Sequence, residues 1–383
     1  MLYYDNAATT FPKPRSVLNS VATAVTDFGG NPGRGGHNMA MKVSEKIYSI
    51  RKKTGDFFHT DAENVVFTSN CTMALNMAIK GVLQRGDHVI LSCLEHNAVI
   101  RPIYKMNQDG MIDYDIAPVT DYDDEKTVSS FEGLIRPNTK AIVCTHASNV
   151  SGVVMPIRKI GAMCHRHGLI FIVDAAQSAG VLPIDMEQDN IDILCMPGHK
   201  GLYGITGSGM MLHNGGRMLN TLMEGGTGSL SSHLEQPDFS PDRYESGTVN
   251  TAGILSIEAG IDFIRSMGMD KIYRHEFTLC SKVWRAFRSN PDICLYNEKY
   301  PYRQNAPILS FNIRGMSSET ITEELNRRNF ALRGGLHCAP LAHEHYGTLD
   351  TGMARFAPSI FSKESEVEQF IRSVENVCKK LPS

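Results

Sequence analysis

The sequence predicts an α/β fold, with a large domain built on a mostly parallel sheet and a smaller α+β domain after it. From about residue 60 to 215, apolar runs of strand length alternate with helical patterns. That alternation is typical of βαβ units whose sheet is buried on both faces. The length of the chain also favours two domains, because a single core stops growing at about 250–300 residues and this chain has 383.

The elements of the large domain follow one another along the chain. The strands are expected at 64–69, 88–92, 141–148, 169–174, 191–196 and 209–213. Helices are expected between them, at 71–84 and 156–168. Three loops rich in glycine or serine, too long and specific to be mere linkers, lie at 29–37, 224–232 and 246–253.

A second set of elements follows these loops. Helical patterns occupy about 254–290. After them come a strand-like run at 307–313, a helix at 317–329, a short apolar segment at 330–335, a second strand-like run at 353–359 and a last helix at 363–381. We therefore expect a large domain at 15–254. The small domain is expected at 255–383, together with the N-terminal segment 1–14.

Composition excludes several classes of protein. The chain has 38 Lys and Arg against 41 Asp and Glu, and it contains no basic block, so nucleic acid is not an expected partner. No apolar run approaches the roughly 18 residues of a membrane span, and the N-terminus does not resemble a secretion signal. The nine cysteines are scattered and include no CxxC pair, which favours reduced thiols in a cytoplasmic protein.

An acidic residue and a lysine follow two neighbouring strands of the predicted sheet. Asp174 ends an apolar strand, where open α/β sheets bind ligands, and Lys200 follows the next strand beside His199. Alone, the carboxylate fits a helix cap and the lysine fits a solvated turn. Together they match pyridoxal phosphate (PLP), which needs an amine for its Schiff base and an anion for its ring nitrogen. Gln177 is placed to face the same ligand.

Two further segments suit such a cofactor. Cys71 and Thr72 lie where a predicted helix begins, so backbone N–H groups and a hydroxyl are available there for a phosphate. An ordinary helix cap explains the same pattern. His96 follows the strand at 88–92, where an imidazole can stack on a flat ring or serve only the structure.

Cys338 lies among Gly, His and Pro residues, whereas most of the other cysteines lie in apolar runs. Arg333 and His337 nearby favour the thiolate, which is the nucleophilic form of cysteine. A metal site is the competing interpretation, because His343 and His345 also lie close by. Their spacing matches no zinc pattern, so no metal site is predicted.

Arg355, in the strand-like run at 353–359, is a candidate for binding an α-carboxylate. A guanidinium can hold a carboxylate through two parallel hydrogen bonds. A surface arginine with no such role is the alternative.

Ten segments in chain order resemble the class V aminotransferase-like branch of fold-type I PLP enzymes, and specifically cysteine desulfurases and selenocysteine lyases. They are YYDNAATT, NPGRGGH, TSNCTMALN, EHNAV, ASNVSG, VDAAQSAG, PGHKGLYG, EGGTGS, YESGTVN and RGGLHCAPLAH. The group it resembles most has its cysteine in a short R-x-G-x-x-C-A-P segment, which residues 333–340 reproduce. This resemblance implies a seven-stranded, mostly parallel sheet in the large domain.

The resemblance also implies roles for individual residues. The implied catalytic residues are Lys200, Cys338 and His96. The implied cofactor-binding residues are Lys200, Asp174, Gln177, His96, Thr72, Cys71, His199, Asn149 and Thr248. The implied substrate-binding residues are Arg355, Asn149 and Arg333.

The implied activity is conversion of L-cysteine to L-alanine, with sulfur taken up by Cys338 as a persulfide for sulfur mobilisation such as iron–sulfur cluster assembly. Lys200 would carry PLP and act as the base. Thr248 would reach the active site of a neighbouring subunit, which implies a homodimer, and a sulfur-acceptor protein is a further implied partner.

Two departures from the family pattern bear on substrate choice. Pro197 stands where the family often has a serine that donates to the phosphate. The segment FAPSIFSK at 356–363 replaces a small residue followed by a Tyr-Asn-Thr run. Three alternatives therefore stay open. They are a selenocysteine lyase, another class V aminotransferase or β-lyase, and a non-catalytic sulfur-relay or scaffold protein.

Overall fold

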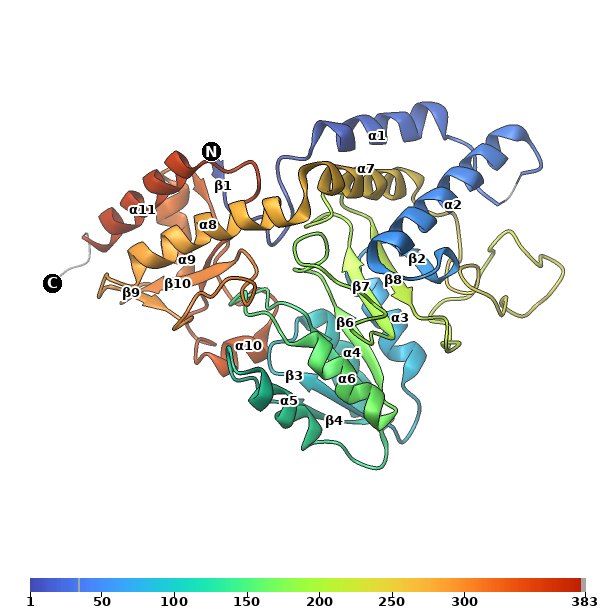
Figure 1. Cartoon of the computed structure of the whole chain (residues 1–383), viewed down its shortest axis with the longest axis horizontal. Coiled ribbons are helices and arrows are strands. Elements are labelled where there is room, and N and C mark those ends of the chain that lie inside the picture. Colours follow the sequence, from blue (N-terminus) through green and yellow to red (C-terminus); the bar gives the residue numbers. More distant parts are fainter. Residues whose placement is uncertain (34, 380–383) are drawn as a thin grey trace.

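The computed structural model describes residues 1–33 and 35–379. Arg34 of the first glycine loop, and Lys380 and Leu381 of the predicted last helix, lie outside the described residues. The chain forms a large lobe around one sheet and a smaller lobe that holds the N-terminus and the last described helix (Figure 1).

Seven strands form the central sheet, in the order β2-β8-β7-β6-β5-β3-β4. They are β2 (Val65–Thr68), β3 (His88–Ser92), β4 (Asp113–Ala117), β5 (Thr139–Thr145), β6 (Ile170–Asp174), β7 (Ile193–Pro197) and β8 (Gly209–His213). β8 runs antiparallel to both of its neighbours, and the other pairs are parallel. The predicted mostly parallel, seven-stranded sheet is therefore confirmed.

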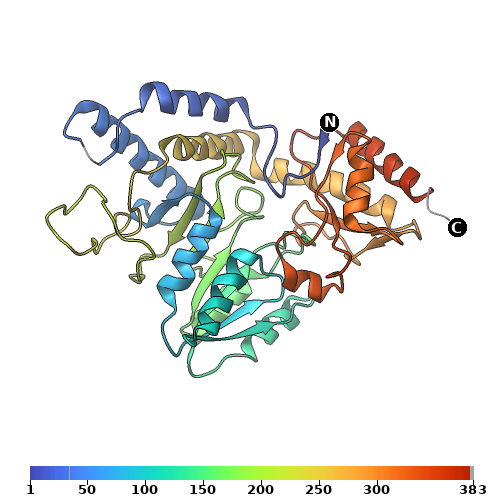
Figure 2. The same cartoon turned by 180° about the vertical axis from the view of Figure 1, so that it is seen from behind.

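Helices cover both faces of this sheet (Figures 1 and 2). Along β5, Ile142 and Cys144 belong to one apolar cluster, whereas Ala141 and Val143 belong to the other. The second cluster includes α3 (Cys71–Val82) and α4 (Asn97–Gln108). The first includes α1 (Arg15–Asp27), α2 (Asn38–Phe58), α6 (Ile157–His167) and α7 (Thr251–Met267). Because both faces are buried, the inner strands β6 and β7 are buried at every position and mostly apolar.

Two short helices complete the large lobe. The 3₁₀ helix η1 (Ala62–Asn64) leads into β2, and α5 (Asp124–Glu132) packs beside α6. Within the described residues, no helix is long and apolar enough to cross a membrane.

The small lobe is built on a three-stranded antiparallel sheet. Its strands, in spatial order, are β12 (Ala354–Phe356), β10 (Leu309–Ile313) and β9 (Ile293–Leu295). Its helices are α8 (Met269–Phe287), α9 (Ser318–Asn326), α10 (Pro340–His345) and α11 (Glu364–Cys378). β1 (Leu2–Tyr3) pairs in parallel with β11 (Phe330–Ala331), so the start of the chain is joined to this C-terminal part.

Packing bears on where the two predicted domains divide. Ile257 and Ile261 of α7 belong to the core of the large sheet, whereas Leu279 and Val283 of α8 belong to the core of the small lobe. We therefore propose a division near Gly268, between α7 and α8. The expected boundaries, 15–254 and 255–383 with 1–14, stay predictions.

Candidate active site

A cavity of about 250 Å³ lies at the carboxyl ends of the central strands β6 and β7. It brings together most of the residues singled out in the sequence. Of these, the lining includes Lys200, Asp174, Gln177, His96, Cys71, Thr72, His199, Asn149, Arg333 and Arg355. Cys338 does not line the cavity but lies beside the lining residues Arg333 and His337. Thr248 lines a different cavity.

Asp174 and Lys200 both line the cavity. Asp174 is 2% exposed, and its Oδ1 accepts hydrogen bonds from the Ala176 N–H at 2.8 Å and from Cys71 Sγ at 3.6 Å. Burial raises the pKa of Asp174, against the Ala176 N–H and the positive charge of Lys200.

Lys200 presents a free amine to the cavity. Burial lowers the pKa of Lys200, and the charge of Asp174 opposes that shift. Among the described residues, no group accepts a hydrogen bond from its Nζ. An amine without a partner and with a lowered pKa is suited to attack on a carbonyl group.

His96 begins α4 and presents a neutral ring. Its Nδ1 accepts a hydrogen bond from the Ala98 N–H at 3.0 Å, so the ring proton lies on Nε2. Burial, and then the positive charge of Lys200, lowers the pKa of His96 to about 4. An imidazole that is uncharged at pH 7 suits stacking on a flat conjugated ring.

The start of α3 and His199 lie on the same cavity. Asn70 caps α3 by accepting from the Met73 N–H at 2.9 Å, and the first helical residues, Cys71 and Thr72, follow it. The start of a helix is a favourable place for an anion. Burial lowers the pKa of His199 to about 4, and its Nδ1 lies 3.1 Å from Thr9 Oγ1.

The guanidinium of Arg355 is almost completely buried, at 1% exposed. Its Nη1 donates to the carbonyl oxygen of Asn149 and its Nη2 donates to Oδ1 of Asp5, both at 2.8 Å. The Asn149 side chain in turn donates to the carbonyl oxygen of His337 at 2.8 Å. The proposed carboxylate-binding residues therefore connect directly to the loop that carries Cys338.

Two hydrogen-bond contacts hold the Cys338 loop. The Asn97 N–H donates to the Cys338 carbonyl oxygen at 2.7 Å, and His337 Nε2 lies 2.9 Å from the Met353 carbonyl oxygen. His337 and Cys338 have φ values of +49° and +56°. L-residues rarely adopt this conformation, and it persists where surrounding contacts enforce it.

The thiol of Cys338 is exposed, unlike the other eight cysteines. Arg333 Nη2 lies 3.5 Å from its Sγ, so a positive charge faces the sulfur. The rings of His337 and His343 are buried and lie 5.7 Å apart. Over residues 1–33 and 35–379, no group of three or more His, Cys, Asp or Glu side chains is arranged to hold a metal ion.

Thr248 is not brought to this cavity within one chain. It lines a separate cavity together with Ser69 and Met73, and its Oγ1 accepts from Asn31 Nδ2 at 3.3 Å. Its predicted role in a neighbouring subunit stays a prediction.

Two acidic residues that contact lining residues of the cavity were not predicted from the sequence. Asp5 pairs with Arg355, as described above. Glu95 is completely buried before His96, and its Oε1 accepts from Ser92 Oγ at 2.5 Å and from the Thr145 N–H at 2.8 Å. Asp5 and Glu95 lie in YYDNAATT and EHNAV, two of the segments that resemble the family. That resemblance was the feature of the sequence that could have identified them.

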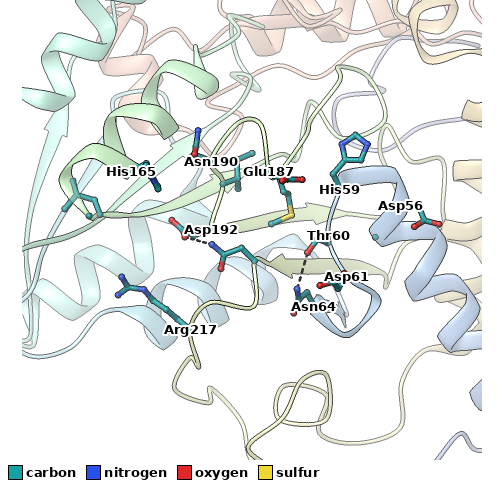
Figure 3. A pocket seen from close by; sticks show the side chains of 16 residues that line it. Asp56, His59, Thr60, Asp61, Asn64, His165, Glu187, Asn190, Asp192 and Arg217 are labelled. Carbon is teal, nitrogen blue, oxygen red and sulfur yellow. Dashed lines mark hydrogen bonds between the residues drawn. The ribbon is translucent and has the colours of Figure 1, made fainter.

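A larger cavity, of about 840 Å³, lies at the opposite edge of the sheet, near the amino ends of β6 and β7 (Figure 3). Many of the side chains that line it are polar, and hydrogen bonds join two pairs of them. Asn214 Nδ2 donates to Asp192 at 2.6 Å, and Asn64 Nδ2 donates to Thr60 Oγ1 at 3.3 Å. No lysine is among the described residues that line it, so the amine chemistry belongs to the smaller cavity.

Comparisons with known proteins identify the family of the chain. The model of the aminotransferase class V family matches residues 2–370. A protein of Methanothermobacter thermautotrophicus named "Probable cysteine desulfurase" is 28% identical, over 98% of this chain and 94% of its own. The "Cysteine desulfurase" of Pectobacterium atrosepticum is also 28% identical, over 100% of this chain and 94% of its own.

The structures agree as well. The apo structure of a cysteine desulfurase from Thermococcus onnurineus is similar to this chain with a TM-score of 0.91 and 27% identity, covering 99% of this chain and 95% of that one. Since the family model spans nearly the whole sequence, the chain belongs to the aminotransferase class V family.

Proposed function

We propose that the protein is a PLP-dependent cysteine desulfurase that converts L-cysteine to L-alanine and takes up the sulfur on Cys338 as a persulfide. The observation that carries the proposal is one cavity that combines the unpartnered amine of Lys200, the buried carboxyl of Asp174 and the guanidinium of Arg355, with the Cys338 thiol beside it. The desulfurase relatives add support.

The residues present fit PLP. When bound, this cofactor supplies a conjugated ring that accepts electron density from the α-carbon of an amino acid. Lys200 would hold it covalently, Asp174 would pair with the ring nitrogen, Gln177 would meet the phenolic oxygen and His96 would stack on the ring. Its phosphate would lie at the start of α3, near the residues Cys71, Thr72 and His199.

The protein's own groups would then carry the reaction. Arg355 and Asn149 hold the α-carboxylate of the substrate, and the Lys200 amine removes the α-proton. Cys338 Sγ attacks the substrate sulfur, so an S–S bond forms as the C–S bond breaks. The electron pair of the broken bond remains on the three-carbon fragment, which takes up a proton and leaves as alanine.

Mass spectrometry after turnover tests this assignment. We expect incubation with L-cysteine to add one sulfur atom to the peptide that contains Cys338, and borohydride to fix the cofactor on Lys200. Lys200→Ala should lose the fixed cofactor, and Cys338→Ala should lose the added sulfur. Cys294→Ala, which changes a half-buried thiol outside the site, is the matched control and should keep both signals. Sulfur added to another cysteine would contradict the assignment of Cys338.

The exposed thiol beside Arg333 favours this reading over an aminotransferase that has no use for Cys338. Selenocysteine lyase remains the second candidate on the same residues. Comparing Cys338→Ala on the two amino acids separates them, because a selenol leaves with little help from the protein thiol.

The partners are also proposals. We infer a homodimer in which Thr248 of each subunit reaches the cofactor phosphate of the other, and a protein that accepts sulfur from Cys338. Nine free cysteines support a reducing compartment such as the cytoplasm. Sedimentation of the full chain at twice the monomer mass is the expected result for the dimer.

A further inference from the structure

The N-terminal segment 5–10 contacts four of the residues that line the cavity. Its contacts are Asp5 Oδ1 with Arg355 Nη2 at 2.8 Å, the Ala7 carbonyl oxygen with Gln177 Nε2 at 3.0 Å, Thr9 Oγ1 with His199 Nδ1 at 3.1 Å, and Thr10 Oγ1 with the Lys200 carbonyl oxygen at 2.7 Å. This segment, DNAATT, is therefore part of the wall of the site.

Asp5 is the resident counter-ion of Arg355. Of the two partners of the guanidinium, the Asn149 carbonyl is neutral and only Asp5 carries a charge. Arg355 Nε is buried without a partner. A buried cation without an anion is costly, so Asp5 is what makes burial of Arg355 tolerable in the ligand-free protein.

Asp5 approaches Arg355 from outside the cavity. The lining of the cavity includes Arg355 but not Asp5. Its place is fixed by the backbone, since a bridge joins Asp5 to Ala357 and the Asn6 N–H donates to the Ala357 carbonyl oxygen at 3.2 Å. An amino acid in the cavity would therefore meet Arg355 from one side, while Asp5 holds it from another.

We propose that Asp5 is a positioning residue that sets how tightly the site holds the α-carboxylate of its amino acid, an inference that rests on the proposed function for the identity of that amino acid. A carboxylate entering the cavity meets an ion pair that is already neutral overall, so its attraction to Arg355 is weakened by repulsion from Asp5. The weaker grip allows the amino-acid product to leave after each turnover.

The test compares two ligands that differ only by a carboxylate, L-alanine and ethylamine. Their dissociation constants are measured by calorimetry on the cofactor-loaded enzyme. Asp5→Asn keeps an oxygen that accepts from Arg355 and removes the charge. We expect it to bind L-alanine at least about fivefold more tightly, since the ligand then supplies the only anion for a buried cation, with ethylamine unchanged.

A control and a second variant complete the experiment. Asp270→Asn removes a carboxylate that pairs with arginines on the surface and should change neither constant. Asp5→Ala removes the same charge and replaces Asp5→Asn if the latter fails to fold. Equal or weaker binding of L-alanine by the Asp5 variants would overturn the proposal, as would an equal change for both ligands.

The proposed function can fail separately. Suppose that the wild-type enzyme releases no sulfur from cysteine while the Asp5 variants bind L-alanine more tightly and ethylamine as the wild type does. In that case the desulfurase assignment is wrong and the role of Asp5 stands. If sulfur is released normally and the variants bind L-alanine as the wild type does, the reverse holds.

Discussion

Replacement of Glu95 by glutamine should change how the stability of the protein depends on pH. Glu95 is completely buried, and burial raises its pKa to about 8 from an ordinary value of 4.5, against hydrogen bonds from Ser92 and Thr145. Its Oε2 has no hydrogen-bond partner. In the folded protein the carboxyl therefore keeps its proton at neutral pH, and glutamine has nearly the same shape and polarity as that protonated acid.

The sign and the size follow from linkage. In the unfolded chain Glu95 loses its proton near pH 4.5, whereas in the folded chain it loses it near pH 8. Between these values the folded state binds more protons, so the wild-type protein loses stability as the pH rises. For these two pKa values the loss between pH 6 and pH 8 is about 2 kcal/mol. Glu95→Gln lacks this group and should not show that part of the loss.

Urea unfolding of both proteins at pH 6 and at pH 8 measures the effect. We expect the free energy of unfolding of Glu95→Gln, relative to wild type, to rise by about 2 kcal/mol over this interval. Glu276→Gln is a matched comparison, because burial also raises the pKa of Glu276, on α8, to about 8. A difference between Glu95→Gln and wild type that does not change with pH would refute the reasoning.

Two further substitutions test the packing and the nucleophile. A Cβ at Gly260 would lie 1.8 Å from the Leu202 carbonyl oxygen, so Gly260→Ala should destabilise the protein by roughly 1–3 kcal/mol in urea unfolding; Gly133→Ala, with a nearest neighbour at 3.4 Å, is the control. Arg333→Gln removes the charge beside Cys338 Sγ and should slow alkylation of that thiol by iodoacetamide several-fold at neutral pH, whereas an unchanged rate would mean that Arg333 does not activate it.

The central sheet and the meeting of Asp174 with Lys200 in one cavity could be predicted because the signals are local. β6 and β7 are buried at every position and are apolar apart from Asp174 at the end of β6. Asp174 ends one of them and Lys200 follows the other, and strand ends in such a sheet meet at one edge. Pairing the two residues needed only their order along the chain.

Weakly buried elements gave no comparable signal. β4 lies at the edge of the sheet, and among its residues only Ala117 is buried. α1 buries only Val17 and Ala24. α2 is different, because its apolar residues, such as Val43 and Ile47, recur at helical spacing. That spacing predicts a helix here, although none was expected from the sequence.

The carboxylate end of the site depends on contacts that no local pattern contains. Asp5 and Arg355 are 350 residues apart in sequence, and their ion pair forms because β1 joins the C-terminal lobe beside β11. Glu95 could not be distinguished from an exposed acid at the start of a helix, since its burial is produced by Thr145 and the strands around it.

The two departures from the family pattern, Pro197 and residues 356–363, lie in different places relative to the cavity that contains Lys200. Pro197 lines the Lys200 cavity and has no N–H or hydroxyl to donate there. Residues 356–363 do not line that cavity. Ala357 and Ser359 of this segment line a smaller neighbouring space shared with Lys200 and Glu276. The contacts of Arg355 with Asn149 and Asp5 form in the presence of the altered segment. We therefore propose that a difference in substrate choice be sought first around Pro197 and Lys200.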